Sequence, residues 1–135
     1  MHLKRFTDPV KFYDHIAPAL TQHEAENNLI FGLTNDAING RYDINTVYMA
    51  CVEQEGEVVL VVLRTVTFRV QLSYMPPQFD YLRLHALESV VNDLVATYGP
   101  DIAGVQGVSP VVKDFLSVWE GRTQQTYALH MAQRI

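Results

Sequence analysis

The residues best suited to chemistry form a short polar stretch near the N-terminus, consisting of Glu24, Glu26, Asn27 and Asn28. Carboxylates accept hydrogen bonds from an ammonium group, and side-chain amides both donate and accept them. The stretch could therefore contact a polar ligand. Local roles explain the same residues: Glu24 would close a capping box with Thr21, Glu26 would favour a positively polarised helix start, and the asparagines would lie on the solvent face or bond locally.

The other reactive side chains do not form a recognisable catalytic or metal motif. The five histidines are scattered without a His-x-x-x-His pair, and a zinc site with the single cysteine would need several of them to converge. We therefore predict no metal site, with the histidines at the surface or bonded to the backbone. Cys51 lies in the apolar run 47–52 and is expected to be a buried structural thiol. No dinucleotide or Walker glycine pattern occurs.

Composition indicates one globular domain spanning residues 1–135. Apolar residues make up 48% of the chain and charged residues 19%, values that favour a packed core over disorder. The net charge is −5 and the basic residues are scattered, so we expect no nucleic-acid partner. Without an apolar stretch after the basic N-terminus, and with a longest apolar run of only 58–63, we expect a cytoplasmic protein with no membrane partner.

Helical spacing of apolar residues predicts four helices. Asp8-Pro9 should cap the first, and Thr21 to Glu24 should begin the second, whose buried stripe would contain Ala25, Leu29, Leu33 and Ala37 and which would end at Asn39-Gly40. Asp80 should cap a third helix that ends at Gly99-Pro100, and Ser109-Pro110 a fourth that closes at Gly121.

Runs of β-branched residues predict strands between and around these helices. They cover residues 3–6, 47–53, 57–65, 68–74, 103–107 and 125–135, with a hairpin turn at Gln54-Glu55-Gly56. The second and third strands do not alternate, which predicts cover on both faces, whereas 68–74 alternates and should have one wetter face. The order predicts an α/β (α+β) fold, with a mixed, mostly antiparallel sheet and helices on both faces.

Local phrases and the order of elements resemble the GNAT superfamily of N-acetyltransferases. The phrases are 24–33 in the second helix, 47–50 in the second strand and 61–65 in the third, and they are similar to those of a bacterial subgroup. In that subgroup such a sequence forms the N-terminal half, and a C-terminal GNAT half with the catalytic motif follows. The resemblance implies that the longer protein transfers an acyl group from acetyl-coenzyme A to an amine. It also implies that the first two helices line the acceptor side, so the polar stretch of Glu24, Glu26, Asn27 and Asn28 could face the amine or the missing second half. The apolar, strand-like ending at Ile135 also favours a piece of a longer chain.

The chain departs from the GNAT pattern where the cofactor would bind. Members of the family have Gln or Arg, two residues, Gly, one residue, and Gly or Ala between the fourth strand and the next helix, which gives free backbone N–H groups for the diphosphate. Here residues 73–82 contain no glycine, two prolines and Asp80. The helix after the fifth strand also lacks the tyrosine that serves the family as general acid. We therefore predict no catalytic residue, and no cofactor bound by this chain alone.

Three functional hypotheses follow from these observations. The first is a non-catalytic GNAT-like half that packs against a C-terminal half and shapes the amine cleft. The second is a free-standing binding or dimerisation module of the same fold, with a homodimer partner. The third is an acyltransferase that grips acetyl-coenzyme A through the strand backbone at Leu72, Ser73 and Tyr74.

Overall fold

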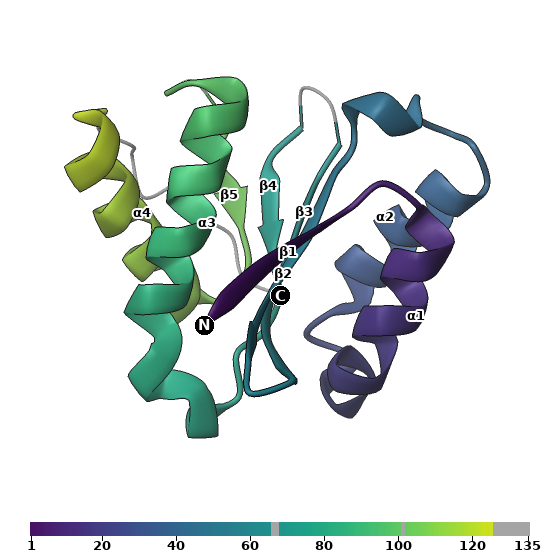
Figure 1. Ribbon diagram of the computed structural model, residues 1–135, viewed down its shortest axis with the longest axis horizontal. Coiled ribbons are helices and arrows are strands. Elements are labelled where there is room, and N and C mark those ends of the chain that lie inside the picture. Colours follow the sequence, from purple (N-terminus) through teal and green to yellow (C-terminus); the bar gives the residue numbers. More distant parts are fainter. Residues whose placement is uncertain (66–67, 101, 126–135) are drawn as a thin grey trace.

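The computed structural model describes residues 1–65, 68–100 and 102–125 as a five-stranded sheet with a pair of helices on each face. The strands lie in the order β1 (His2–Phe6), β2 (Tyr48–Gln54), β3 (Glu57–Arg64), β4 (Val70–Leu72) and β5 (Val105–Gln106). All neighbours are antiparallel except β4 and β5, which are parallel. Helices α1 (Pro9–Leu20) and α2 (Asn28–Ile38) cover one face, and α3 (Arg83–Tyr98) and α4 (Ser109–Thr123) cover the other (Figure 1). The predicted fold class is confirmed.

The central hairpin of β2 and β3 organises the sheet. Gln54 pairs with Glu57, so the turn consists of Glu55 and Gly56 alone, and both have positive φ, at 52° and 82°. Two positive φ values match the right-handed twist of the strands, and Gly56 adopts its value without a Cβ clash. Most residues of both strands are buried, and the residues that are not lie next to the turn, as the lack of alternation predicted.

Two apolar clusters lie on opposite faces of the sheet, because successive residues of β2 and β3 point to opposite sides. Met49, Cys51 and Val61 pack against α1 and α2, whereas Ala50 and Val62 belong to the cluster under α3 and α4. The larger members of the second cluster include Tyr48, Leu87, Leu94, Phe115 and Trp119.

Within the described residues, no helix has the length and apolar run that a membrane span requires.

The start of α1 agrees with the prediction, whereas the start of α2 does not. Asp8 caps α1 by accepting a hydrogen bond from the Val10 N–H at 2.9 Å. The predicted capping box at Thr21 to Glu24 is wrong: residues 21–23 form a 3-10 turn and α2 begins at Asn28. The physical reason is that the Thr21 hydroxyl donates backwards to the Ala17 carbonyl at 2.6 Å, which finishes α1 instead of opening α2. Ala25, expected in the buried stripe, is exposed.

The predicted wetter face of the fourth strand is also wrong. Gln71 and Ser73 are 2% and 1% exposed. The Gln71 amide donates to the Gln106 side chain at 2.9 Å, and the Ser73 hydroxyl accepts from the Val61 N–H at 2.8 Å. Polar residues that alternate along a strand are therefore buried here because each has a partner inside the sheet.

The third helix ends at Gly99 as predicted but begins later than predicted, and the fourth helix differs from the prediction at both ends. Asp80 does not cap α3, because residues 77–82 form a 3-10 helix (η3) and α3 starts at Arg83. Ser109 is the first residue of α4 rather than its cap, and α4 runs past Gly121 until Gln124 adopts a left-handed conformation with φ of 65°. Apart from Gln125, the predicted final strand (125–135) lies outside the described residues.

Candidate functional site

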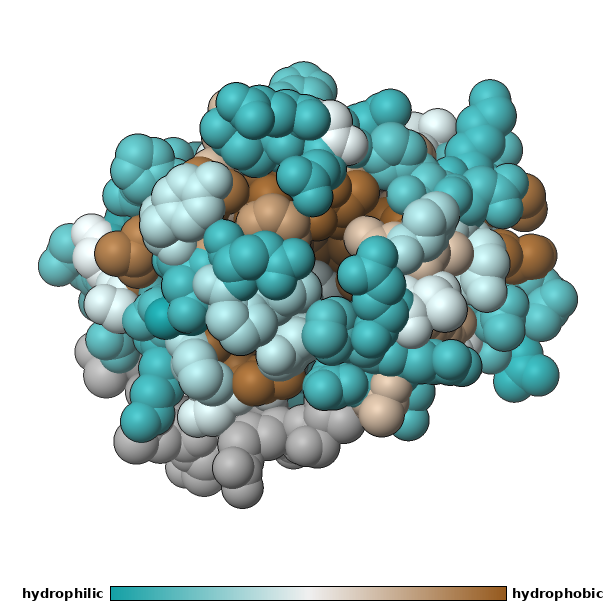
Figure 2. All heavy atoms as spheres, turned by 90° about the horizontal axis from the view of Figure 1, so that it is seen from below, coloured by the Kyte–Doolittle hydropathy of each residue, from teal (hydrophilic) through white to brown (hydrophobic). Residues whose placement is uncertain are grey.

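A pocket of about 290 Å³ opens at the end of the sheet where β4 leaves it. Its walls come from the end of α1 and the following turn (His15–His23), Asn27, the start of β3 (Gly56–Val59), and the segment from Ser73 to Phe79. We call it the α1–β4 pocket. Figure 2 views the molecule from this end and shows apolar surface recessed between hydrophilic side chains near the middle of the face. The volume is near the lower end of the range for small-molecule sites.

Asn27 joins the two walls of this pocket. The residue is 2% exposed, and its side chain accepts a hydrogen bond from the Tyr74 N–H at 2.9 Å and donates one to the Leu20 carbonyl at 3.3 Å. Leu20 ends α1 and Tyr74 follows β4, so one amide fastens the helix layer to the strand end. The position of the Tyr74 ring in the pocket therefore depends on Asn27.

The polar groups of the pocket can both donate and accept hydrogen bonds. The rings of His23 and Tyr74 are in contact, with centroids 4.6 Å apart. The carboxylate of Glu57 and the amides of Gln22 and Gln78 belong to the same lining. Imidazole, phenol, carboxylate and amide groups around a small recess suit a small polar ligand that carries an amine or hydroxyl group.

The structure separates the polar stretch that the sequence singled out. Asn27 lines the pocket, whereas Glu24, Glu26 and Asn28 are not among its lining residues. Glu24 and Asn28 are exposed, and Glu26 is half-buried. Of the three strand residues, Ser73 and Tyr74 line the pocket, and Leu72 belongs to the cluster under α3 and α4. The spacing of the polar stretch gave no indication that only one of its members would turn inward.

The backbone donors at the end of β4 already have partners in this chain. The Ser73 N–H donates to the Val61 carbonyl at 3.0 Å, and the Tyr74 N–H donates to Asn27. A cofactor that used these two amides would have to displace both bonds, each of which costs free energy to break in a buried setting.

The junction between β4 and α3 is shaped by two prolines and three charges. Pro76 and Pro77 carry no backbone N–H, and the Phe79 N–H donates to the Pro76 carbonyl at 2.9 Å. The Arg83 guanidinium lies 3.2 Å from the Asp80 carboxylate and 2.7 Å from that of Asp114. Two carboxylates face one guanidinium here, so the start of α3 has a net negative charge that opposes a diphosphate.

A second group of reactive side chains lies beside the pocket on the α1 face of the sheet. His15 on α1 hydrogen-bonds through Nε2 to the Glu53 carboxylate, and the same carboxylate is 3.9 Å from the Cys51 sulfur. Burial first, and the Glu53 charge second, raise the pKa of the Cys51 thiol to about 12. The thiol is therefore neutral near pH 7, as the sequence predicted for a structural cysteine.

Sequence reasoning missed this group because its members come from separate elements. Cys51 and Glu53 are two residues apart on one strand, so they share a face, and this spacing was the only available signal. His15 is brought to them by the packing of α1 on the sheet, which no local pattern specifies.

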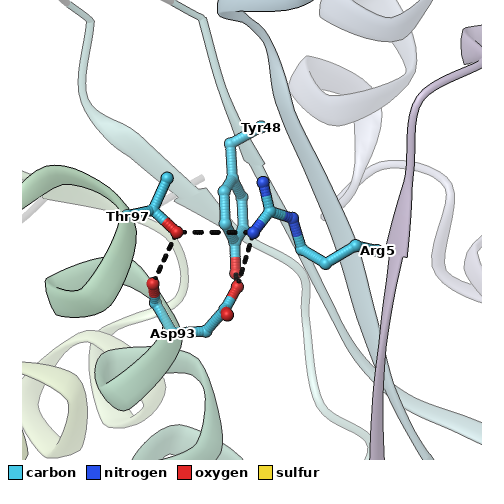
Figure 3. A network of polar contacts seen from close by, with 4 residues as sticks. All are labelled: Arg5, Tyr48, Asp93 and Thr97. Carbon is cyan, nitrogen blue, oxygen red and sulfur yellow. Dashed lines mark hydrogen bonds and ion pairs between the residues drawn. The ribbon is translucent and has the colours of Figure 1, made fainter.

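A third polar network holds the edge strand against the opposite helix layer (Figure 3). Arg5 on β1 forms an ion pair with Asp93 on α3 at 3.0 Å, and its guanidinium lies 4.3 Å from the centroid of the Tyr48 ring. The Tyr48 hydroxyl donates to the same Asp93 carboxylate at 2.6 Å. Burial and this hydrogen bond raise the pKa of Tyr48 far above its ordinary value. The network has a structural role, because it ties β1, β2 and α3 together away from the pocket.

The α1–β4 pocket is thus a recess whose lining suits a small polar ligand, and the histidine, cysteine and glutamate beside it form a separate cluster. Comparison with protein-family models, with curated protein sequences and with solved structures finds no match to this chain.

Proposed function

We propose that this chain is the N-terminal, GNAT-like half of an N-acetyltransferase, with the α1–β4 pocket on the acceptor side of the full protein. The observation that carries the proposal is the course of the chain: two helices between the first two strands, then an antiparallel meander that leads into α3. This order is the one on which the resemblance to GNAT proteins rests. The acceptor of the longer protein would be an amine, and its acyl donor acetyl-coenzyme A.

The half described here would not transfer the acyl group by itself. Prolines at 76 and 77, and the carboxylates around Arg83, oppose a diphosphate at the start of α3. The α4 positions that pack inward are Val111, Val112, Phe115, Leu116 and Trp119, none of which carries an acidic hydroxyl. The chain would contribute packing surface and pocket walls, and a C-terminal half would contribute the catalytic groups.

Calorimetry tests the first part of this proposal. Acetyl-coenzyme A titrated into this chain should give no binding heat up to millimolar ligand. A micromolar signal would overturn the non-catalytic assignment, and the third hypothesis, in which Ser73 and Tyr74 hold the cofactor, would take its place.

The coding sequence beyond residue 135 tests the second part. A following half with the glycine motif is expected, and a stop codon directly after Ile135 would contradict the proposal. In the longer protein His23→Ala should raise the KM for the amine while leaving the KM for acetyl-coenzyme A unchanged. The matched control is His85→Ala, since His85 is an exposed residue of α3 outside the pocket lining.

One observation favours the alternative of a free-standing binding module. The α1–β4 pocket gathers an imidazole, a phenol and a carboxylate around one recess of this chain, which is the donor and acceptor set that a small amine requires. A stop codon after Ile135, together with binding of a small amine that His23→Ala abolishes, would support that alternative.

A further inference from the structure

The cluster of His15, Cys51 and Glu53 has the composition and spacing of a metal site. One ligand atom from each, a ring nitrogen, a sulfur and a carboxylate oxygen, lies within 4.8 Å of the other two. Ligands of a tetrahedral zinc ion sit about 2.0 to 2.3 Å from the metal, so their mutual separations fall in the same range of a few ångströms. Only small side-chain movements would bring the three atoms around one ion.

We propose that His15, Cys51 and Glu53 bind a zinc ion. The mixture of nitrogen, sulfur and oxygen donors suits Zn²⁺ better than the hard cations Mg²⁺ or Ca²⁺, which take oxygen ligands. On binding, the thiol proton leaves to solvent, and the thiolate and carboxylate together balance the charge of the ion. The ion and its ligands together then carry no net charge, which matters because an unbalanced charge is costly to bury.

The surroundings of the cluster give the ion both a rigid base and a route from solvent. Cys51 is fully buried between β1 and β3 in the middle of the sheet, so its sulfur is fixed. The His15 and Glu53 side chains are 32% and 17% exposed, which leaves the cluster open on that side. His15 also lines the α1–β4 pocket, so the ion would lie next to that recess.

The register of the edge strand places one more imidazole, that of His2, on the same face of the sheet as the cluster. His2 on β1 pairs directly with Glu53 on β2, and residues opposite each other in an antiparallel pair leave the same face of the sheet. Lys4 pairs with Cys51 in the same way and so leaves the same face of the sheet. Its ammonium group lies over the Phe6 ring, 5.4 Å from the ring centroid. His2 is exposed and can turn towards the ion, and water would fill the position in its absence.

Cobalt spectroscopy of the unmutated chain gives a direct test, because Co²⁺ takes the place of zinc and a cobalt–thiolate bond has its own charge-transfer band. Titration of metal-free protein with Co²⁺ should give this band with one equivalent bound, and one equivalent of Zn²⁺ should remove it. Absence of the thiolate band at a several-fold excess of Co²⁺ would overturn the proposal without any substitution.

Variants assign the ligands. Cys51→Ala should abolish the band, and His15→Gln and Glu53→Gln should each weaken Zn²⁺ binding at least tenfold. His2→Ala should weaken it by a smaller factor. His85→Gln is the matched control and should bind like the parent, because His85 is an exposed residue of α3, which covers the opposite face of the sheet from the cluster. Circular dichroism of each variant establishes that it is folded, and equal affinity in His15→Gln and the parent would refute the assignment.

The metal test is independent of the acyltransferase proposal. Zinc binding by this chain needs neither acetyl-coenzyme A nor a second half. If the chain binds zinc and a stop codon follows Ile135, the metal site stands and the proposed function falls. If the chain does not bind zinc and a half with the glycine motif follows, the proposed function stands and the metal site falls.

Discussion

Replacement of Asn27 by alanine should destabilise the protein far more than replacement of its neighbour Asn28. The Asn27 amide is buried and makes two hydrogen bonds, to the Tyr74 N–H at 2.9 Å and to the Leu20 carbonyl at 3.3 Å. Asn28 is the first residue of α2 and is exposed. The two adjacent asparagines therefore form a matched pair that differs in burial and bonding.

The expected loss follows from the Tyr74 N–H, which Asn27→Ala leaves without a partner, and from the lost bond to the Leu20 carbonyl. A buried unsatisfied group costs about 1–3 kcal/mol, and a lost hydrogen bond whose acceptor keeps another donor costs about 0.5–1.5 kcal/mol. The free energy of unfolding should fall by about 2–4 kcal/mol in total. For a urea dependence of about 2 kcal/mol per M, the midpoint of unfolding should fall by about 1–2 M.

Urea unfolding followed by circular dichroism measures this difference. Asn28→Ala should change the free energy of unfolding by no more than about 0.5 kcal/mol, as surface substitutions usually do. If the midpoints of the two variants agree within about 0.3 M, with m-values of about 2 kcal/mol per M, Asn27 does not fasten the pocket walls and the reasoning is refuted.

Three further outcomes can be measured. Tyr48→Phe should lower stability near neutral pH by about 1–2 kcal/mol, because Asp93 loses its hydroxyl donor. Because the pKa of Tyr48 is raised in the folded protein, its contribution to the free energy of unfolding is complete below the ordinary tyrosine pKa. Above that pH the unfolded chain ionises at this tyrosine and the contribution declines. The stability of Tyr48→Phe should therefore fall less steeply than that of the parent as the solution becomes alkaline. Gly107→Ala should cost about 1–3 kcal/mol, because its Cβ would lie 3.0 Å from the Leu72 carbonyl oxygen. Gly121 lies within α4 with no atom near the position of a Cβ, so Gly121→Ala should instead stabilise the protein by about 0.5–1 kcal/mol. Thermal unfolding measures both glycine variants, and equal effects would contradict the described packing.

Sequence patterns were sufficient for the elements that depend on local periodicity. The β2–β3 hairpin was predicted because the turn chemistry of Glu55-Gly56 and the flanking apolar strands agree with each other. The four helices were predicted from apolar spacing. The boundaries that failed are those where a competing local structure forms, as where Thr21 bonds back to the preceding helix and where residues 77–82 form a 3-10 helix before α3.

The candidate sites were less accessible to prediction, because each is assembled from segments far apart in the chain. Asn27 faces Tyr74 across 47 positions, and His15 meets Glu53 across 38. Such pairs depend on how α1 and the following turn dock on the sheet. The alternation of Gln71 and Ser73 was misleading for the same reason: a polar side chain signals solvent only when no buried partner exists, and here the partners were Gln106 and Val61.

The division of the interior into two clusters means that the two sides of the molecule can vary separately. In the described residues, the cluster under α1 and α2 and the cluster under α3 and α4 have no side chain in common. They are joined through the backbones of β2 and β3, whose conformation a conservative side-chain replacement leaves unchanged. Losses from substitutions such as Ile16→Val on one side and Val112→Ala on the other should therefore simply add, and each layer is free to acquire new sequence without compensating changes across the sheet.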